Sequence, residues 1–263
     1  MSDNVVLHAI DDDVQPVIKK ITVADLKDIV RSGMDDFAAH PSHRVFLSLI
    51  FPIAGFFIVR FALDQTVWPL VIPLVTGFAL VGSFAAIGMY GLSRRHEHYP
   101  AVTWRGSMDA FRSAAFPQIL ALGLIQAALY VMWVFSAEMI YAAIYGSATP
   151  ENMTVLLDQV FGTSQGFTLI AVGTLVGFMF AAIVFSISVV SFPLLIDYNV
   201  SLSTAVSTSV KAVLANPIPM AAWAAFIASM LILGSIPFFV GLAIVFPILG
   251  HASWHMYRKV VEV

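Results

Sequence analysis

Long uncharged apolar runs constrain the fold of this chain more than any other feature. Residues 218–237 contain no Asp, Glu, Lys or Arg. About twenty apolar residues are what an α-helix needs to cross roughly 30 Å of hydrocarbon at 1.5 Å per residue. A second apolar run covers residues 238–257, and the segment Gly-Ser-Ile-Pro between the two runs is only long enough for a tight turn. The pattern predicts a transmembrane hairpin.

The composition of the whole chain agrees with that prediction. Of its 263 residues, 59% are hydrophobic and only 11% are charged, which is typical of helical membrane proteins. The 13 Lys and Arg residues are scattered, so nucleic-acid binding is disfavoured. The absence of cysteine excludes disulfides and thiolate metal sites. The first forty residues have mixed charge and do not resemble a signal peptide.

We predict an all-α membrane protein with six transmembrane helices arranged as three hairpins. Residues 1–21 are expected to be a disordered cytoplasmic tail, and residues 22–263 a single membrane domain. The predicted spans cover residues 45–63, 67–92, 116–145, 167–196, 218–236 and 238–257.

An amphipathic helix is predicted before each hairpin. The first begins at Thr22, where Asp25 completes a pattern similar to a capping box. Its expected apolar face consists of Val23, Leu26, Ile29, Val30, Met34 and Phe37. Such a face favours a position on the membrane surface. The second helix is expected from Ser93 to Ala115.

The third amphipathic helix is expected to end at Asn216, because Pro217 pushes the residue before it out of the helical conformation. Its apolar residues follow helical spacing and are Val206, Val210, Val213 and Leu214. Each of the three helices leads to a proline, in the phrases FAAHP, AFRSAAFP and VLANP. The chain therefore resembles three copies of one unit, although apolar helices also resemble one another by chance.

The distribution of Lys and Arg predicts the orientation. Five precede the first predicted span, four lie between the second and third, one lies between the fourth and fifth, and two follow the sixth. Only Arg60 falls on the other side. The positive-inside rule therefore predicts that both termini are cytoplasmic.

Several segments also resemble a known family. They are SFPLLIDYNVSLSTAVSTSVKAVLANPIPMAAW, VFPILGHASWHMYRKVV, the Gly-Met-Asp-Asp at residues 33–36 and the Tyr-Gly-Leu-Ser-Arg at residues 90–94. Together they are similar to the bacterial integral-membrane family called domain of unknown function 2189, over residues 21–261. The resemblance implies a multi-pass protein of the bacterial inner membrane without established activity.

Histidine is the residue type that could point to a metal. A haem-copper oxidase subunit needs about six histidines deep in the membrane, whereas five of the seven here lie outside the predicted spans. His251 and His255 lie at i and i+4 near the end of the last predicted span, where two imidazoles could contribute half of a zinc or copper site. The alternative is an interfacial belt with Trp254 and Tyr257. We expect no metal and no cofactor.

Other polar and small residues have both structural and functional interpretations. Arg60 and Glu138 lie toward the outer ends of their predicted spans, where each side chain can extend to water or the two can pair and line a substrate path. Gly173, Gly177 and Ala181 form a small-residue ridge that favours helix packing.

Pro193 and Pro247 lie at similar distances from the cytoplasmic ends of their predicted spans. Paired breaks of this kind are either kinks or transporter binding positions. No motif of a hydrolase, a metalloprotease or a phosphate-binding loop is present. The sequence thus predicts a non-enzymatic accessory, scaffold or assembly protein that contacts lipid and either a membrane-protein partner or further copies of itself. The alternative is a small-solute transporter or channel.

Overall fold

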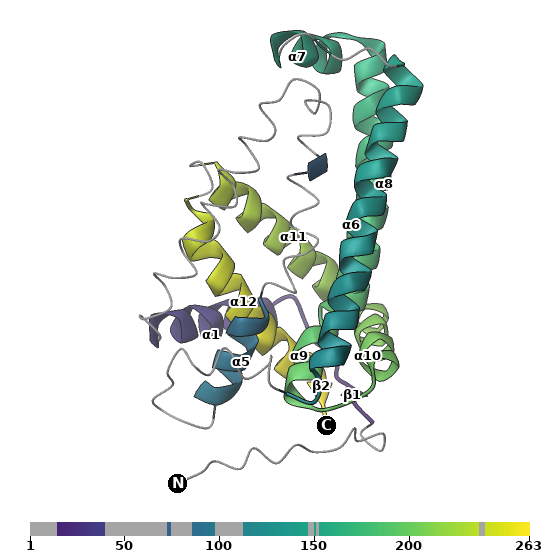
Figure 1. Cartoon of the computed structure of the whole chain (residues 1–263). Helices are drawn as coiled ribbons and strands as arrows, with labels where there is room; N and C mark the ends of the chain where they lie inside the picture. Colours follow the sequence, from purple (N-terminus) through teal and green to yellow (C-terminus); the bar gives the residue numbers. More distant parts are fainter. Residues whose placement is uncertain are drawn as a thin grey trace. The chain divides into compact units, whose positions relative to one another are not determined.

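The computed structural model describes residues 15–39, 73–74, 86–97, 113–146, 150, 153–236 and 240–263. The described chain is mostly helical, so the predicted all-α class is confirmed in outline (Figure 1). Its helices are α1 (Asp25–Ala39), α5 (Ile87–His96), α6 (Phe116–Tyr145), α7 (Met153–Gly162), α8 (Ser164–Ser188), α9 (Ser191–Asp197), α10 (Leu202–Ala215), α11 (Pro217–Ser235) and α12 (Leu242–Val260). Two short strands, β1 (Val17–Ile18) and β2 (Val261–Glu262), pair antiparallel.

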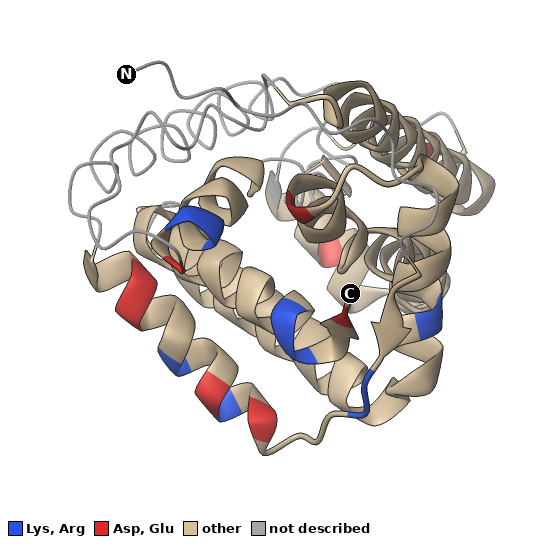
Figure 2. Ribbon diagram, turned by 90° about the horizontal axis from the view of Figure 1, so that it is seen from below, with Lys and Arg blue, Asp and Glu red and all other residues tan. Residues whose placement is uncertain are grey.

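Three segments of the described chain are long and apolar enough to cross a membrane: α6, α8 with α9, and α11. They correspond to the predicted spans 116–145, 167–196 and 218–236. Together they carry two acidic residues, Glu138 and Asp197, and no Lys or Arg, whereas α1 carries acids and bases along its length (Figure 2). The predicted span 45–63 and most of 67–92 lie outside the described residues. The predicted span 238–257 corresponds to α12, which is not among the three.

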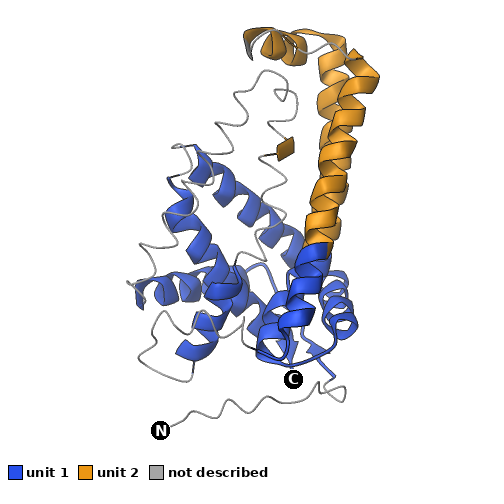
Figure 3. Cartoon of the chain, in the orientation of Figure 1, with its two compact units in different colours: residues 1–52, 83–124, 186–263 blue, residues 53–82, 125–185 orange. Residues whose placement is uncertain are grey.

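The chain forms two compact units (Figure 3). Unit 1 consists of residues 1–52, 83–124 and 186–263, and unit 2 of residues 53–82 and 125–185. Unit 2 contains α7 and most of α6 and α8. Unit 1 contains the two strands and the other described helices, and it holds the candidate site.

Apolar contacts dominate unit 2. The Trp133 ring packs over Gly177, where an added Cβ would lie only 2.9 Å from it, and the Trp133 Nε1–H donates a 3.0 Å hydrogen bond to the Pro73 carbonyl. Large apolar side chains elsewhere on α6 and α8 are exposed, including Met139 at 72% and Phe178 at 70%. Exposed apolar side chains at this density suit helices that are surrounded by lipid rather than water.

In unit 1, α12 packs against α1, α5 and α11. The side of α1 that faces the protein is lined by Ile29, Gly33 and Asp36, spaced at i, i+4 and i+7. Gly33 is needed because an added Cβ would lie 2.6 Å from the backbone nitrogen of Ala252 on α12. The predicted apolar face of α1 is only partly buried: Ile29 is 2% exposed, whereas Val23 and Met34 are about half exposed. The close approach at Gly33, rather than the number of apolar residues, decides which side packs.

The start of α1 agrees with the predicted cap. The backbone N–H and the hydroxyl of Thr22 both donate to Oδ2 of Asp25, each at 2.8 Å. Lys259 at the end of α12 lies 2.9 Å from the other oxygen of the same carboxylate. The hydrogen bonds from Lys259 and then from Thr22 lower the pKa of Asp25 to about 2. The cap thus also ties α1 to α12.

The helix is interrupted between α8 and α9. Pro193 in the first turn of α9 has no N–H to donate to the preceding turn. Two serines satisfy nearby backbone groups: Ser191 Oγ donates to the Ile187 carbonyl at 2.6 Å, and Ser209 Oγ on α10 accepts from the Val190 N–H at 3.2 Å. Pro247, by contrast, lies inside α12, which continues through it.

Asn216 separates α10 from α11 and also holds the start of the described chain. Its Oδ1 accepts a 2.9 Å hydrogen bond from the Ile21 N–H, and its Nδ2 donates to the Lys19 carbonyl at 3.0 Å. Residues 17–21 lie in the predicted disordered tail, yet the structure orders them through these bonds and through pairing of β1 with β2. The second amphipathic helix was predicted to start at Ser93, but α5 continues without a break from Ile87 to His96.

The close approach at Gly33 gives a first prediction. Gly33→Ala should destabilise the protein by about 1–3 kcal/mol, because the new methyl group forces α1 away from α12. Gly173→Ala on α8 is the matched control: no atom lies within 4 Å of its added Cβ, so the change should be neutral or slightly stabilising. Thermal unfolding in detergent measures both, and equal shifts would contradict the packing described for Gly33.

Candidate functional site

The polar side chains of unit 1 converge on a buried carboxylate. Asp36 on α1 is only 6% exposed. Its Oδ2 accepts hydrogen bonds from Ser93 Oγ at 2.5 Å and from His255 Nε2 at 3.0 Å, and its Oδ1 accepts one from His96 Nδ1 at 2.9 Å. An ionised carboxylate only accepts hydrogen bonds, so all three partners donate. The site therefore joins α1 to α5 and α12.

The environment of Asp36 favours its ionised form. Burial by itself would raise the pKa of Asp36, but the hydrogen bonds from His255, Ser93 and His96 outweigh burial and hold the pKa well below its usual value. A buried carboxylate without such donors would be strongly destabilising. The donors and the carboxylate thus depend on one another.

A further histidine contacts this carboxylate through Ser93. His251 Nδ1 lies 2.8 Å from Ser93 Oγ, and since the hydroxyl donates to Asp36, it accepts from the imidazole. This order, with serine between histidine and aspartate, differs from a nucleophilic triad, in which the histidine lies in the middle. Ser93 and His251 are also completely buried. The arrangement therefore fits a structural contact rather than attack on a substrate.

A second carboxylate, Asp197 at the end of α9, collects donors from α5 and α12. Arg94 donates to its Oδ1 from Nε at 3.0 Å and to its backbone carbonyl from Nη2 at 2.9 Å. Its Oδ2 accepts from the Tyr257 hydroxyl at 2.9 Å and from Arg258 at 3.3 Å. Asp197 thus ties the end of a candidate span to two other helices.

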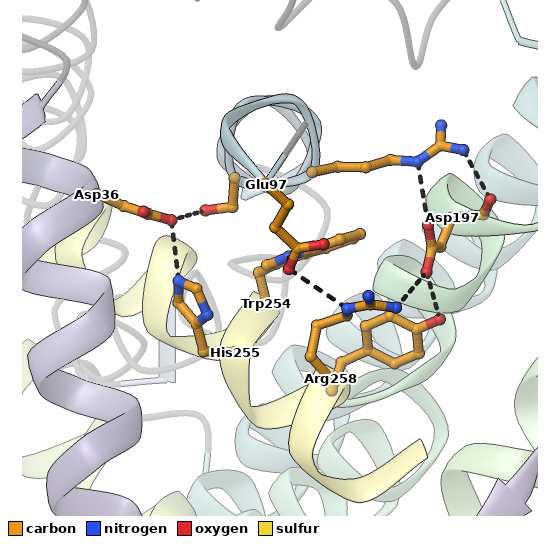
Figure 4. A network of polar contacts seen from close by, with 9 residues as sticks. Asp36, Glu97, Asp197, Trp254, His255 and Arg258 are labelled. Atoms are coloured by element: carbon orange, nitrogen blue, oxygen red, sulfur yellow. Dashed lines mark hydrogen bonds and ion pairs between the residues drawn. The ribbon is translucent and has the colours of Figure 1, made fainter. Parts of the chain in front are cut away.

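Glu97 shares a donor, Arg258, with the second carboxylate. Its Oε1 accepts a 2.9 Å hydrogen bond from Trp254 Nε1 and lies 3.3 Å from Nε of Arg258, which also contacts Asp197 (Figure 4). Trp254 precedes His255 on α12, so the contacts of the three carboxylates lie next to one another along this helix and form a cluster. We call this cluster, centred on Asp36, Glu97 and Asp197, the carboxylate network.

A hollow lies beside the network between α1 and α12. Its lining residues are Asp28, Ile29, Ser32, His255, Arg258 and Lys259. Both basic residues of this lining already contact carboxylates: Arg258 contacts Glu97 and Asp197, and Lys259 contacts Asp25. The hollow therefore does not present unpaired cations to a ligand.

The structure places His251 and His255, the candidate metal ligands, in the carboxylate network. Both rings face Oδ2 of Asp36: His255 Nε2 lies 3.0 Å from this oxygen, and His251 Nδ1 lies 3.9 Å from it and is bonded to Ser93. No group of three or more His, Asp or Glu side chains among the described residues is arranged to hold a metal ion.

The other candidate residues lie away from the network. Glu138 is exposed on α6, and Arg60 lies outside the described residues, so their predicted pair stays a prediction. On α8, Gly177 packs against Trp133, while Gly173 has no atom close to an added Cβ and Ala181 is exposed.

Sequence reasoning did not find Asp36, Ser93, Glu97 or Asp197 as a site. It assigned Ser93 and the charged residues after it to the start of a second amphipathic helix. One signal was available: residues 33–36, residues 90–94 and the segment around His251 were among those that carried the family resemblance. The structure brings these three segments together.

Comparisons with known proteins agree with that resemblance. The family model described as "Predicted integral membrane protein (DUF2189)" matches residues 71–197, so the resemblance predicted over residues 21–261 is confirmed for that part of the chain. The matched region contains α5, α6, α7, α8 and α9. No curated protein and no solved structure matches the chain. The match and the apolar helices indicate an integral membrane protein.

The carboxylate network predicts both the stability and the acid response of the protein. Asp36→Asn should destabilise it by about 1–3 kcal/mol, because the amide nitrogen replaces an oxygen that accepts hydrogen bonds. The low pKa of Asp36 means that below its usual pKa of 3.8 the unfolded chain binds more protons than the folded one. The stability contributed by this group is therefore complete above about pH 4 and is lost as the pH falls further.

Unfolding of detergent-solubilised protein between pH 7 and about pH 3 measures both effects. Wild type should lose stability below about pH 4 more steeply than Asp36→Asn does. Asp35→Asn is the matched control, since Asp35 is the exposed neighbour and surface changes shift stability by no more than about 0.5 kcal/mol. Equal acid slopes in wild type and Asp36→Asn would contradict the role assigned to Asp36.

Proposed function

We propose that this protein is a non-enzymatic accessory, scaffold or assembly protein that acts through contacts with membrane partners or lipids. The observation that carries the proposal is that the three central carboxylates are bonded to donors from neighbouring helices. Asp36, Glu97 and Asp197 together join α1, α5, α9 and α12. Such a network holds helices in register but offers no exposed nucleophile or open set of ligands.

The exposed surface of the candidate spans supports the same proposal. The exposed large side chains of α6 and α8 are predominantly apolar, with Phe135, Met139, Leu175 and Phe178 each more than 60% exposed. Such a surface suits contact with lipids or with other membrane helices, because apolar side chains bind their neighbours through packing.

We further propose a place in the bacterial inner membrane, with both termini and the carboxylate network on the cytoplasmic side. The charges support this orientation: within the described residues, every Lys and Arg lies in unit 1, whereas unit 2 carries Glu138 and Asp158. Basic residues concentrate on the cytoplasmic side of membrane proteins.

Alkaline-phosphatase fusions test this topology. The enzyme is active only outside the cytoplasm, so fusions after Gln65 and after Asn152 should be active, and fusions after Glu97 and Val263 should be inactive. Activity of the Val263 fusion would contradict an even number of spans, and inactivity of the Asn152 fusion would contradict the outer location of α7.

One observation favours the alternative of a small-solute transporter or channel. Gln126 lies within α6 and is fully buried, and among the residues that the structure describes neither its Oε1 nor its Nε2 has a hydrogen-bond partner. A buried amide left without partners in a membrane helix is destabilising, and such groups often contact solutes or water.

Purification from native membranes in a mild detergent distinguishes the two functions. The contact function predicts a membrane protein or a defined lipid that stays bound in stoichiometric amount, as detected by native mass spectrometry. A transporter instead predicts that a solute raises the unfolding temperature of the isolated wild-type protein, and that Gln126→Leu abolishes this rise. A protein that retains neither partner nor lipid, and that a solute stabilises, would overturn the proposal.

A further inference from the structure

The outward side of α10 exposes apolar side chains. Around this helix the residues divide into three groups. Ala205, Thr208, Ser209 and Ala212 are buried, and α10 packs against α9. Val206, Val210 and Val213, spaced at i, i+4 and i+7, are partly exposed. Thr204, Ser207 and Lys211, spaced at i, i+3 and i+7, form a polar edge.

The helical period places these three groups on three different sides. At 3.6 residues per turn, the valine edge and the polar edge flank the buried side from opposite directions. One helix thus has three different sides: a buried side of small residues, a polar edge and a partly exposed valine edge.

The valine edge continues toward the membrane. Leu214 in the last turn of α10 is 74% exposed, and Ile218 in the first turn of α11 is 73% exposed. Only Ala215, Asn216 and Pro217 separate these two side chains, and α11 is one of the candidate membrane spans. The apolar surface of α10 is therefore continuous with a helix whose exposed side chains suit hydrocarbon.

Charge also fits a lipid surface. Lys211 on the polar edge is exposed, and none of the acidic side chains in the described part of the chain pairs with it. A lysine beside an apolar edge is typical of helices that lie in the membrane interface, because its ammonium reaches the phosphates while the apolar side chains enter the acyl region.

α1 provides the contrast. It was predicted, like α10, to lie on the membrane through an apolar face. Its line of Ile29, Gly33 and Asp36 is instead covered by α12 and bonded into the carboxylate network. The side of α1 next to α12 is thus occupied by protein, although Val23 and Met34 on its apolar edge stay about half exposed.

We propose that α10 is a lipid-binding helix that lies in the plane of the membrane interface, with Val206, Val210 and Val213 in contact with phospholipid and Lys211 at the level of the headgroups. This inference rests on the proposed contact function and specifies phospholipid as the partner of this surface. The proposal also predicts that the junction between α10 and α11 lies at the depth of the lipid headgroups.

Spin labelling tests the proposal directly, because the chain contains no cysteine and every introduced cysteine is unique. Val210→Cys and Leu214→Cys are labelled with a nitroxide, and the full-length protein is reconstituted into vesicles of phosphatidylcholine and phosphatidylglycerol. Ser207→Cys on the polar edge is the matched control. Collisions with oxygen, which concentrates in lipid, are compared with collisions with a water-soluble nickel complex.

The labels at Val210 and Leu214 should collide several times more with oxygen, relative to nickel, than the label at Ser207. If the Val210 variant does not fold, Val213→Cys replaces it, since Val213 lies on the same edge. Two outcomes would overturn the proposal: nickel accessibility equal to that at Ser207 would place the edge in water, and loss of collisions with both reagents would place it against protein or a second copy. Either outcome would refute lipid binding by α10 but would not exclude partner binding by other surfaces. Failure of this proposal can therefore be distinguished from failure of the proposed contact function.

Discussion

The buried carboxylate of Asp36 is the constraint on which the arrangement of unit 1 depends. An ionised group with 6% exposure is stable only when several donors surround it, and these donors come from α5 and α12, far from Asp36 in the sequence. Directional hydrogen bonds of this kind fix rotation and register together. Gly33 follows from the same constraint, because α1 must approach α12 closely enough for Asp36 to reach His255.

A polar cluster at the ends of membrane helices can set the register in which these helices pack. Apolar side chains do not distinguish strongly between lipid and a neighbouring helix, so burial alone gives helices in a bilayer little reason to choose one register over another. The hydrogen bonds that Asp197 accepts from Arg94, Tyr257 and Arg258 favour one register at the end of a candidate span. The members share donors, since Arg258 contacts both Glu97 and Asp197, so we expect changes at these residues to be coupled.

The sequence predicted the long apolar helices, but it did not predict which side of each amphipathic helix packs against protein. The predicted span 116–145 has the same bounds as α6, and the cap at Thr22 and Asp25 is present. These features could be predicted because they are local: hydropathy over twenty residues and a hydrogen bond over three residues need no tertiary information.

In contrast, the packed sides of α1 and α10 are lined by Gly33 and Asp36 in one helix and by Ala205 and Ser209 in the other. Hydropathy assigns the apolar residues of such helices to the membrane surface, but it does not show which small or polar residues pack against protein. The carboxylate network was missed because its members come from segments that only the fold brings together.

The pairing of β1 with β2 and the bonds of Asp36 set an order for biosynthesis. Asp36 and His255 are separated by 219 positions, so a ribosome produces α1 long before the donors that its carboxylate needs. During that interval α1 has an incompletely bonded carboxylate and an uncovered Gly33 side. Docking of α1 is therefore a late event that follows insertion of the helices between them. A chain that stops before His251 lacks His255, one of the donors of Asp36, and the α12 backbone against which Gly33 packs.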